Sequence, residues 1–249
     1  CWQRVVSSMN NRFFSKLAAS NIRKNGKAYI PYILSCVMTV ALFYIVKSLS
    51  YNPGLKNMVG SSTMMTMMSM CSVIIALFAI VFLFYTNSFL MKRRKKEFGV
   101  FNILGMEKSH IAKTMAWENF YVTLISIVVG LVIGIALDKA MFLLIAQVLN
   151  EEITLGFFIS DKAIISTIVM FCVIFLLILL NSIRQIHTAN PIELITAGNA
   201  GEREPKTKWV LTILGLLSLG AGYYIALTIE NPLTALVYFF FAVILVIIG

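Results

Sequence analysis

Residues 91–120, MKRRKKEFGVFNILGMEKSHIAKTMAWENF, place five consecutive basic residues between two long apolar stretches. On its N-terminal side, 35 uncharged residues separate Lys56 from Lys92. On its C-terminal side, 19 uncharged residues separate Glu118 from Asp138. A helix rises ~1.5 Å per residue, so about 20 residues cross a hydrocarbon core of ~30 Å. The pattern predicts two membrane-spanning helices joined by a charged, helix-prone connection.

The composition extends this prediction to the whole chain. Of the 249 residues, 59% are hydrophobic and only 13% are charged, whereas soluble domains are about half apolar and a quarter charged. A lone span in lipid must satisfy its own backbone hydrogen bonds, so each uncharged run is expected to be helical. We therefore expect an all-α, polytopic helical membrane protein. Its six candidate spans are residues 28–48, 67–90, 120–137, 164–183, 209–228 and 233–249.

The distribution of basic residues predicts the orientation of these spans. Of the 21 lysines and arginines, six precede the first span, seven lie between the second and third spans, and four lie between the fourth and fifth. Cytoplasmic loops carry the excess of basic residues, so we expect a cytoplasmic N-terminus. We expect the basic cluster to anchor the second span at the lipid headgroups; it consists of Lys92, Arg93, Arg94, Lys95 and Lys96.

The residue content excludes several other functions. The sequence contains no phosphate-binding loop, no His-Glu-x-x-His and no serine elbow, so we expect no enzyme, metal or cofactor in this chain. The basic cluster lacks interleaved stacking aromatics, which argues against nucleic-acid binding. No acidic residue lies deep in a span, and this argues against a proton- or sodium-coupled carrier. The chain lacks an initial Met, with Met9 a plausible start, and we expect an N-terminal fragment.

Small residues mark places where helices approach one another. The third span contains 130-GLVIG-134, and Gly-x-x-x-Gly spacing lets two helix backbones come close. We expect Gly130 and Gly134 to pack against another helix of the same chain rather than form a dimer contact. Ser218 and Gly222 form a similar pair in the fifth span.

The connection between the second and third spans reads as helix, turn, helix. Residues 97–106 are too short to span, and after Gly105 a second helix begins, with Ser109 as a possible N-cap. We also expect a separate helix at residues 141–150, near the outer interface. The connection has two interpretations: an amphipathic segment resting on the bilayer, or a rigid lever that receives a cytoplasmic partner.

Taken together, these motifs resemble the FtsX-like ABC transporter permeases. The basic cluster, then Glu97-Phe98-Gly99, Leu104-Gly105-Met106, Ile111 and Glu118, is similar to the signature between the second and third helices of that family's four-helix core. The segment 189-ANPIELI-195 is similar to the family's exit from the fourth helix. The resemblance implies a permease core at 29–197 with a coupling helix at 92–116. This core follows a basic N-terminal segment at 1–28. A linker at 198–208 and two further transmembrane helices at 209–249 come after it.

The short first loop and the two spans after the linker resemble the bacitracin-export (Bce-type) permeases. That resemblance implies a permease subunit in a bacterial cytoplasmic membrane, with ATP and Mg bound by a partner ATPase. It also implies resistance to a peptide antibiotic acting on a lipid target, and signalling through a membrane histidine kinase. The alternatives are a regulator that transmits ATPase motion to cell-wall hydrolases and a carrier not coupled to ATP. The expected ATPase contacts are Glu97, Phe98, Gly99, Val100, Phe101, Leu104, Gly105 and Met106.

Overall fold

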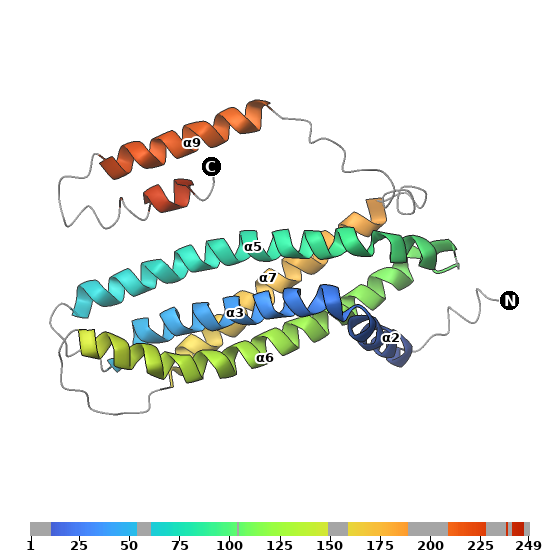
Figure 1. The fold of residues 1–249 in the computed structure, drawn as a ribbon, viewed down its shortest axis with the longest axis horizontal. Coiled ribbons are helices and arrows are strands. Elements are labelled where there is room, and N and C mark those ends of the chain that lie inside the picture. The colour runs from blue at the N-terminus through green and yellow to red at the C-terminus, as the bar shows by residue number, and fades with distance from the viewer. Residues whose placement is uncertain are drawn as a thin grey trace.

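The computed structural model describes residues 11–53, 61–103, 105–148, 159–188, 209–227, 238 and 241–246. Within these ranges the regular elements are helices, and no strand occurs (Figure 1). The helices are α2 (Asn11–Lys24), α3 (Gly26–Tyr51), α5 (Ser61–Ile103), α6 (Lys108–Val148), α7 (Asp161–Thr188) and α9 (Trp209–Leu227).

Four of these helices are long and apolar enough to cross a membrane. The membrane-spanning segments are Gly26–Tyr51, Ser61–Arg94, Lys108–Met141 and Asp161–Ile186. They confirm that the chain is a polytopic helical membrane protein, with the first four spans where the charge-free runs predicted them. The predicted fifth span corresponds to α9, whose apolar stretch is the shorter Thr212–Ile225. Most of the predicted sixth span lies outside the described residues, which cover only 238 and 241–246 of it.

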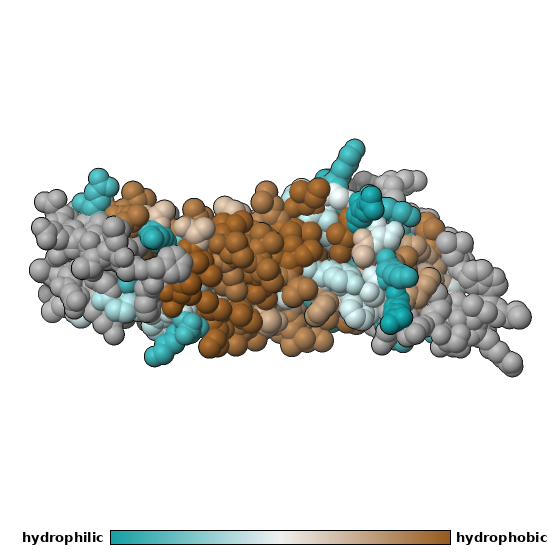
Figure 2. Space-filling view, turned by 90° about the horizontal axis from the view of Figure 1, so that it is seen from below, coloured by the Kyte–Doolittle hydropathy of each residue, from teal (hydrophilic) through white to brown (hydrophobic). Residues whose placement is uncertain are grey.

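Helix α3 occupies the centre of the bundle and contacts α5, α6 and α7 (Figure 1). Its inward side chains Cys36, Val40 and Tyr44 are fully buried. Cys36 and Val40 belong to one apolar core with the buried Phe171 and Phe175 of α7. Its opposite face carries large apolar side chains at every fourth position, and more than half of each is exposed: Ile30, Leu34, Met38 and Leu42. This exposed stripe is the expected lipid-facing surface of a span, since helical residues four apart share a face. Figure 2 shows apolar side chains forming a belt between hydrophilic ends.

The glycine pair of the third span lies at the contact between α3 and α6. A Cβ atom added at Gly130 would lie 2.7 Å from Cβ of Val40, and one added at Gly134 would lie 2.9 Å from Cδ1 of Tyr44. Both distances are too short for real side chains, so only glycine permits the two backbones to approach this closely. The pair therefore packs within one chain.

The second pair of small residues makes an equivalent contact further along the chain. The hydroxyl of Ser218 donates to the carbonyl of Leu245 at 2.7 Å. A Cβ atom at Gly222 would lie 3.1 Å from the carbonyl oxygen of Ala242. Helix α9 thus packs against residues 241–246.

Two predicted helices turn out to be extensions of longer ones. Residues 97–103 continue α5, and residues 141–148 continue α6, so neither the coupling segment nor the outer segment forms a helix of its own. The reason is local: the basic cluster and Glu97 are good helix formers, and a single Gly99 costs only about 1 kcal/mol in a helix. The predicted N-cap was also wrong by two residues, because the carbonyl of Glu107, not a group on Ser109, accepts from the backbone N–H groups of His110 and Ile111.

Candidate functional site

The end of α5 and its junction with α6, residues 100–108, form a sharp reversal that we call the elbow. Gly105 has a φ of +87°, a conformation that side-chain-bearing residues rarely adopt. The N–H of Met106 donates to the carbonyl of Phe101 at 3.0 Å. A left-handed glycine followed by this hydrogen bond across six residues is a Schellman motif, which closes a helix and fixes the direction of departure. The Leu104-Gly105-Met106 sequence is thus a helix stop, although Leu104 itself lies outside the described residues.

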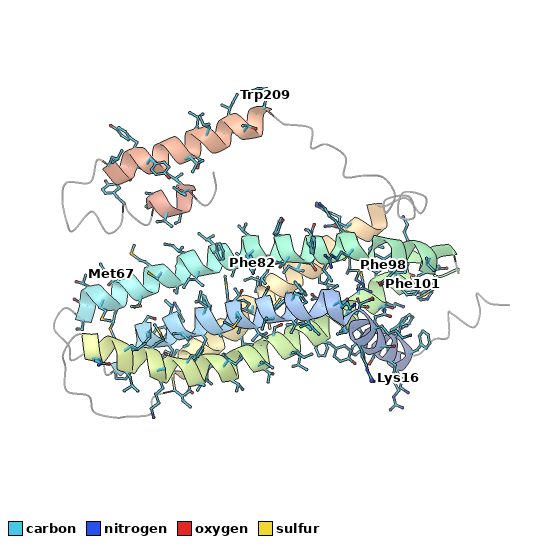
Figure 3. All side chains as sticks on the ribbon, viewed as in Figure 1. Lys16, Met67, Phe82, Phe98, Phe101 and Trp209 are labelled. Atoms are coloured by element: carbon cyan, nitrogen blue, oxygen red, sulfur yellow. The ribbon has the colours of Figure 1, made fainter. Side chains whose placement is uncertain are left out.

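A small apolar cluster, separate from the main core, holds the elbow to the bundle. Its buried members are Met91, Phe98, Ile111, Met115 and Ile186, with Phe101 and Met106 packed against them. These residues come from α5, α6 and the end of α7, so the cluster joins three helices. Figure 3 labels Phe98 and Phe101 at the elbow end of α5, far from Met67 near its start. The two residues that define the Schellman motif, Phe101 and Met106, contribute side chains to the same cluster.

Phe98 lies inside this cluster rather than on the surface. It is only 2% exposed, and the guanidinium of Arg94 lies 4.8 Å from its ring centroid. Phe98, one of the expected ATPase contacts, therefore fills a pocket of its own chain in this conformation, and its contact with an ATPase stays a prediction. Gly99 is buried as well. Val100 is 51% exposed, and Gly105 and Glu107 are exposed too, so these three residues present the outer surface of the elbow.

Arg94 also departs from its predicted place at the headgroups. It is 3% exposed, and its guanidinium forms an ion pair with Glu118 of α6. Its Nη2 donates to Oε1 of Glu118 at 2.9 Å, and its Nη1 donates to the other carboxylate oxygen. By contrast, Lys92 and Arg93 are exposed, and their anchoring at the headgroups stays a prediction. The side chains of Lys95 and Lys96 lie outside the described residues.

Glu118 is the centre of a buried polar network. Asn21 of α2 donates to Oε1 at 3.0 Å, and the hydroxyl of Tyr29 of α3 donates to Oε2 at 2.9 Å. The Nη1 of Arg94 also donates to the hydroxyl of Tyr29. Each carboxylate oxygen therefore has at least two donors, which offsets the cost of burying its charge. Four helices, α2, α3, α5 and α6, meet at this one carboxylate.

Glu97 provides a second connection beside the first. It is partly exposed and lies 3.3 Å from Nε of Arg94, and it accepts a hydrogen bond from Nδ2 of Asn25 at 3.1 Å. Asn25 lies between α2 and α3. The expected contact residue Glu97 therefore links the elbow end of α5 to Asn25, at the start of the first span.

The sequence contained a signal for this network that the spacing argument missed. Asn87, Leu90, Arg94 and Phe98 recur at intervals of three or four residues, and all are buried. A charged residue in that series belongs to the inward face of the helix. Arg94 is one of five consecutive basic residues, and its residue type alone does not mark it as buried. Its position does, because it lies four residues after Leu90 and four before Phe98, on the same face of the helix.

With this geometry established, comparison with known proteins places the chain. Residues 69–191 match the family described as FtsX-like permease C-terminal. The chain contains an FtsX-like permease domain. The matched part of the permease domain begins in α5, includes the elbow and α6, and extends beyond the end of α7. Arg94 and Glu118 lie inside the match, whereas their partners Asn21 and Tyr29 precede it.

Similarity to individual proteins extends over most of the chain. The uncharacterized ABC transporter permease YvcS of Bacillus subtilis is 34% identical over 236 residues, which are 94% of this chain and 36% of that protein. The bacitracin export permease protein BceB of Bacillus subtilis is 24% identical over 216 residues, 85% of this chain and 33% of that one. BceB of Halalkalibacterium halodurans is 28% identical over 216 residues, 84% of this chain and 33% of that one. The chain thus spans about a third of the length of these relatives.

Proposed function

We propose that this chain is part of an ABC transporter permease whose elbow receives a partner ATPase at the cytoplasmic face of a bacterial cell membrane. The single observation that carries the proposal is the buried Arg94–Glu118 ion pair, which connects an exposed elbow to four helices. A segment that transmits force to the spans needs an exposed surface for its partner and a rigid connection to the helices. The elbow has an exposed surface, and the ion pair provides the connection.

The partner ATPase would bind ATP and Mg and supply the energy for the cycle. Its closure would push on the surface made by Val100, Gly105 and Glu107. The Schellman turn and the apolar cluster around Phe98 make the elbow rigid, so the push would tilt α5 and α6 together instead of bending the connection. The network at Glu118 would pass the displacement to α2 and α3. Packed helices that change between discrete arrangements are the usual carriers of such transitions.

The permease would act in resistance to antimicrobial peptides that target the cell wall, such as bacitracin. The similarity to bacitracin export permeases supports this assignment. The same similarity supports two further partners: the peptide antibiotic or its lipid target, and a membrane histidine kinase that signals its presence. The positive-inside rule supports the proposed orientation, because exposed Lys92 and Arg93 lie toward the elbow end of α5.

Co-purification of the complete permease with a co-expressed candidate ABC ATPase tests the proposed contact. Val100→Asp places a charge on the exposed face of the elbow without entering the apolar cluster, and we expect it to abolish ATPase retention while the permease stays folded. Phe13→Asp is the matched control, because Phe13 is a similarly exposed apolar side chain on α2, at 44% against 51%. Phe98→Asp is unsuitable, since it would bury a charge. Equal retention in the Val100→Asp and Phe13→Asp variants would reject the elbow as the contact.

A further inference from the structure

A groove lies between α3 and α5, away from the polar network at Glu118, and the proposed ATPase coupling does not use it. Its volume is about 180 Å³, several times the ~30 Å³ that a water molecule occupies in the liquid. It is lined mainly by apolar atoms, and its lining includes Lys27, Pro31, Ser35, Thr86, Phe89 and Arg93.

The lining residues follow a consistent order along two antiparallel helices. Lys27 lies at the start of the α3 span, and Arg93 lies at the end of the α5 span. Ser35 is eight residues further along α3, and Thr86 is seven residues back along α5. At ~1.5 Å per residue, both positions are about 11 Å deeper than the two cations. The groove therefore has a basic mouth at the membrane boundary and a narrow body that enters the hydrocarbon region.

The two cations at the mouth are available to a ligand. Lys27 and Arg93 are exposed, and among the described residues neither forms an ion pair with a carboxylate. The guanidinium of Arg93 lies 4.6 Å from the ring centroid of Phe89, and this cation–π contact holds it beside the groove. Among the described residues, none that lines the groove is acidic. The mouth is thus suited to an anion.

The body of the groove opens onto the lipid-facing surface. Ile30 and Leu34, on the neighbouring turns of α3, are 66% and 59% exposed, and Phe89 is 52% exposed. An occupant therefore needs a negatively charged head at the level of Lys27 and Arg93 and an apolar tail that enters along the helices from the bilayer. A free inorganic anion satisfies only the first requirement.

We propose that this groove binds one anionic phospholipid, with its phosphate between Lys27 and Arg93 and the beginning of an acyl chain between Pro31 and Phe89. The bound lipid would fill the space between α3 and α5, the two helices whose ends the Glu97–Asn25 hydrogen bond joins. The inference rests on the proposed function only in assigning the lipid to the cytoplasmic leaflet. Binding itself requires neither the orientation nor the ATPase.

Native mass spectrometry of the complete permease, delipidated in detergent, tests this proposal. The protein is titrated with phosphatidylglycerol, with phosphatidylcholine of the same acyl chains, and with inorganic phosphate. We expect one saturable phosphatidylglycerol adduct and much weaker binding of phosphatidylcholine. Lys27→Gln and Arg93→Gln should each weaken the phosphatidylglycerol adduct about fivefold, the usual effect of one basic side chain facing an anionic membrane surface.

Lys92→Gln is the matched control. It removes the same charge from the exposed residue next to Arg93, yet Lys92 does not line the groove. We expect Lys92→Gln to weaken the phosphatidylglycerol adduct less than twofold. Ser35→Leu fills the groove without changing any charge and should reduce adduct formation as strongly as Arg93→Gln. Size-exclusion chromatography verifies that each variant remains folded.

Three results would overturn the proposal. Equal losses of phosphatidylglycerol binding in Lys92→Gln and Arg93→Gln would show that the lipid responds to the overall surface charge and not to a site at Arg93. Equal binding of phosphatidylcholine would show that charge plays no part. Displacement of the adduct by millimolar inorganic phosphate would show a free-anion site instead of a lipid site. Since the assay contains no ATPase and no membrane orientation, each of these results is independent of the outcome for Val100→Asp.

Discussion

Removing Arg94 from the buried ion pair should lower the unfolding free energy more than removing Glu118. Arg94→Gln leaves the Glu118 carboxylate, which is 3% exposed, with only Asn21 and Tyr29 as donors. Removing one partner of a buried pair costs about 3–5 kcal/mol, because the remaining charge has no counterion. Glu118→Gln leaves Arg94 with a second carboxylate, that of Glu97 at 3.3 Å. Its cost should be closer to the about 1.5–3 kcal/mol of a lost charged hydrogen bond.

A double-mutant cycle measures this coupling. The double variant Arg94→Gln/Glu118→Gln has no uncompensated charge at Glu118, so its loss of unfolding free energy should be smaller than the sum of the two single losses. Residues in one ionic network couple by about 0.5–3 kcal/mol, and we expect the upper half of that range. Equilibrium unfolding in mixed detergent micelles, followed by the fluorescence of Trp117, provides the free energies.

Arg93→Gln is the control for charge removal from the same helix. Arg93 is exposed, and such substitutions change the stability by about 0.5 kcal/mol or less. Two outcomes would refute the reasoning about the network. One is an Arg94→Gln variant as stable as Arg93→Gln. The other is a double variant whose loss equals the sum of the single losses within about 0.5 kcal/mol.

The remaining predictions concern the glycines. Gly134→Ala places a Cβ atom 2.9 Å from Tyr44 and should lower the unfolding free energy by about 1–3 kcal/mol. Gly220→Ala is the control, because its Cβ atom meets no atom within 4 Å and should leave the unfolding free energy unchanged. Equal shifts in melting temperature for the two variants would contradict the close α3–α6 contact. Gly105→Ala should cost about 1–2 kcal/mol because of its φ of +87°. Gly105→Asn should cost less, since asparagine tolerates that conformation, and a thermal melt in which Gly105→Asn is the more damaging substitution would contradict the turn assignment.

The positions of the first four spans could be predicted from the sequence because one physical constraint fixes them. Hydrocarbon excludes charge over about 20 helical residues, and the gaps between charged residues record that thickness directly. The close contact of Gly130 and Gly134 was predictable for a similar reason, since only packing makes small residues useful at that spacing in lipid.

The site was predicted less completely, because its important contacts join distant parts of the chain. Nothing in the local sequence links Arg94 to Glu118, which is 24 residues away, or Asn21 to Glu118, which is 97 residues away. The pattern located the turn at Gly105 but not the burial of Phe98. That burial depends on Ile186 of α7 and on the direction in which the Schellman motif sends α6. Helix ends were misplaced for a simpler reason: strong helix formers in 92–97 carry α5 past the membrane boundary.

The central claim is that the elbow faces the cytoplasm, where an ATPase can reach it, and thiol accessibility tests this most directly. Single cysteines are introduced as Val100→Cys at the elbow and Tyr51→Cys at the opposite end of the bundle, both at exposed positions, in a background without the native cysteines. Intact cells are treated with a membrane-impermeant maleimide. The account predicts that Tyr51→Cys is labelled at once, whereas Val100→Cys is labelled only after the membrane is permeabilised. Labelling of Val100→Cys on intact cells, with Tyr51→Cys protected, would contradict it.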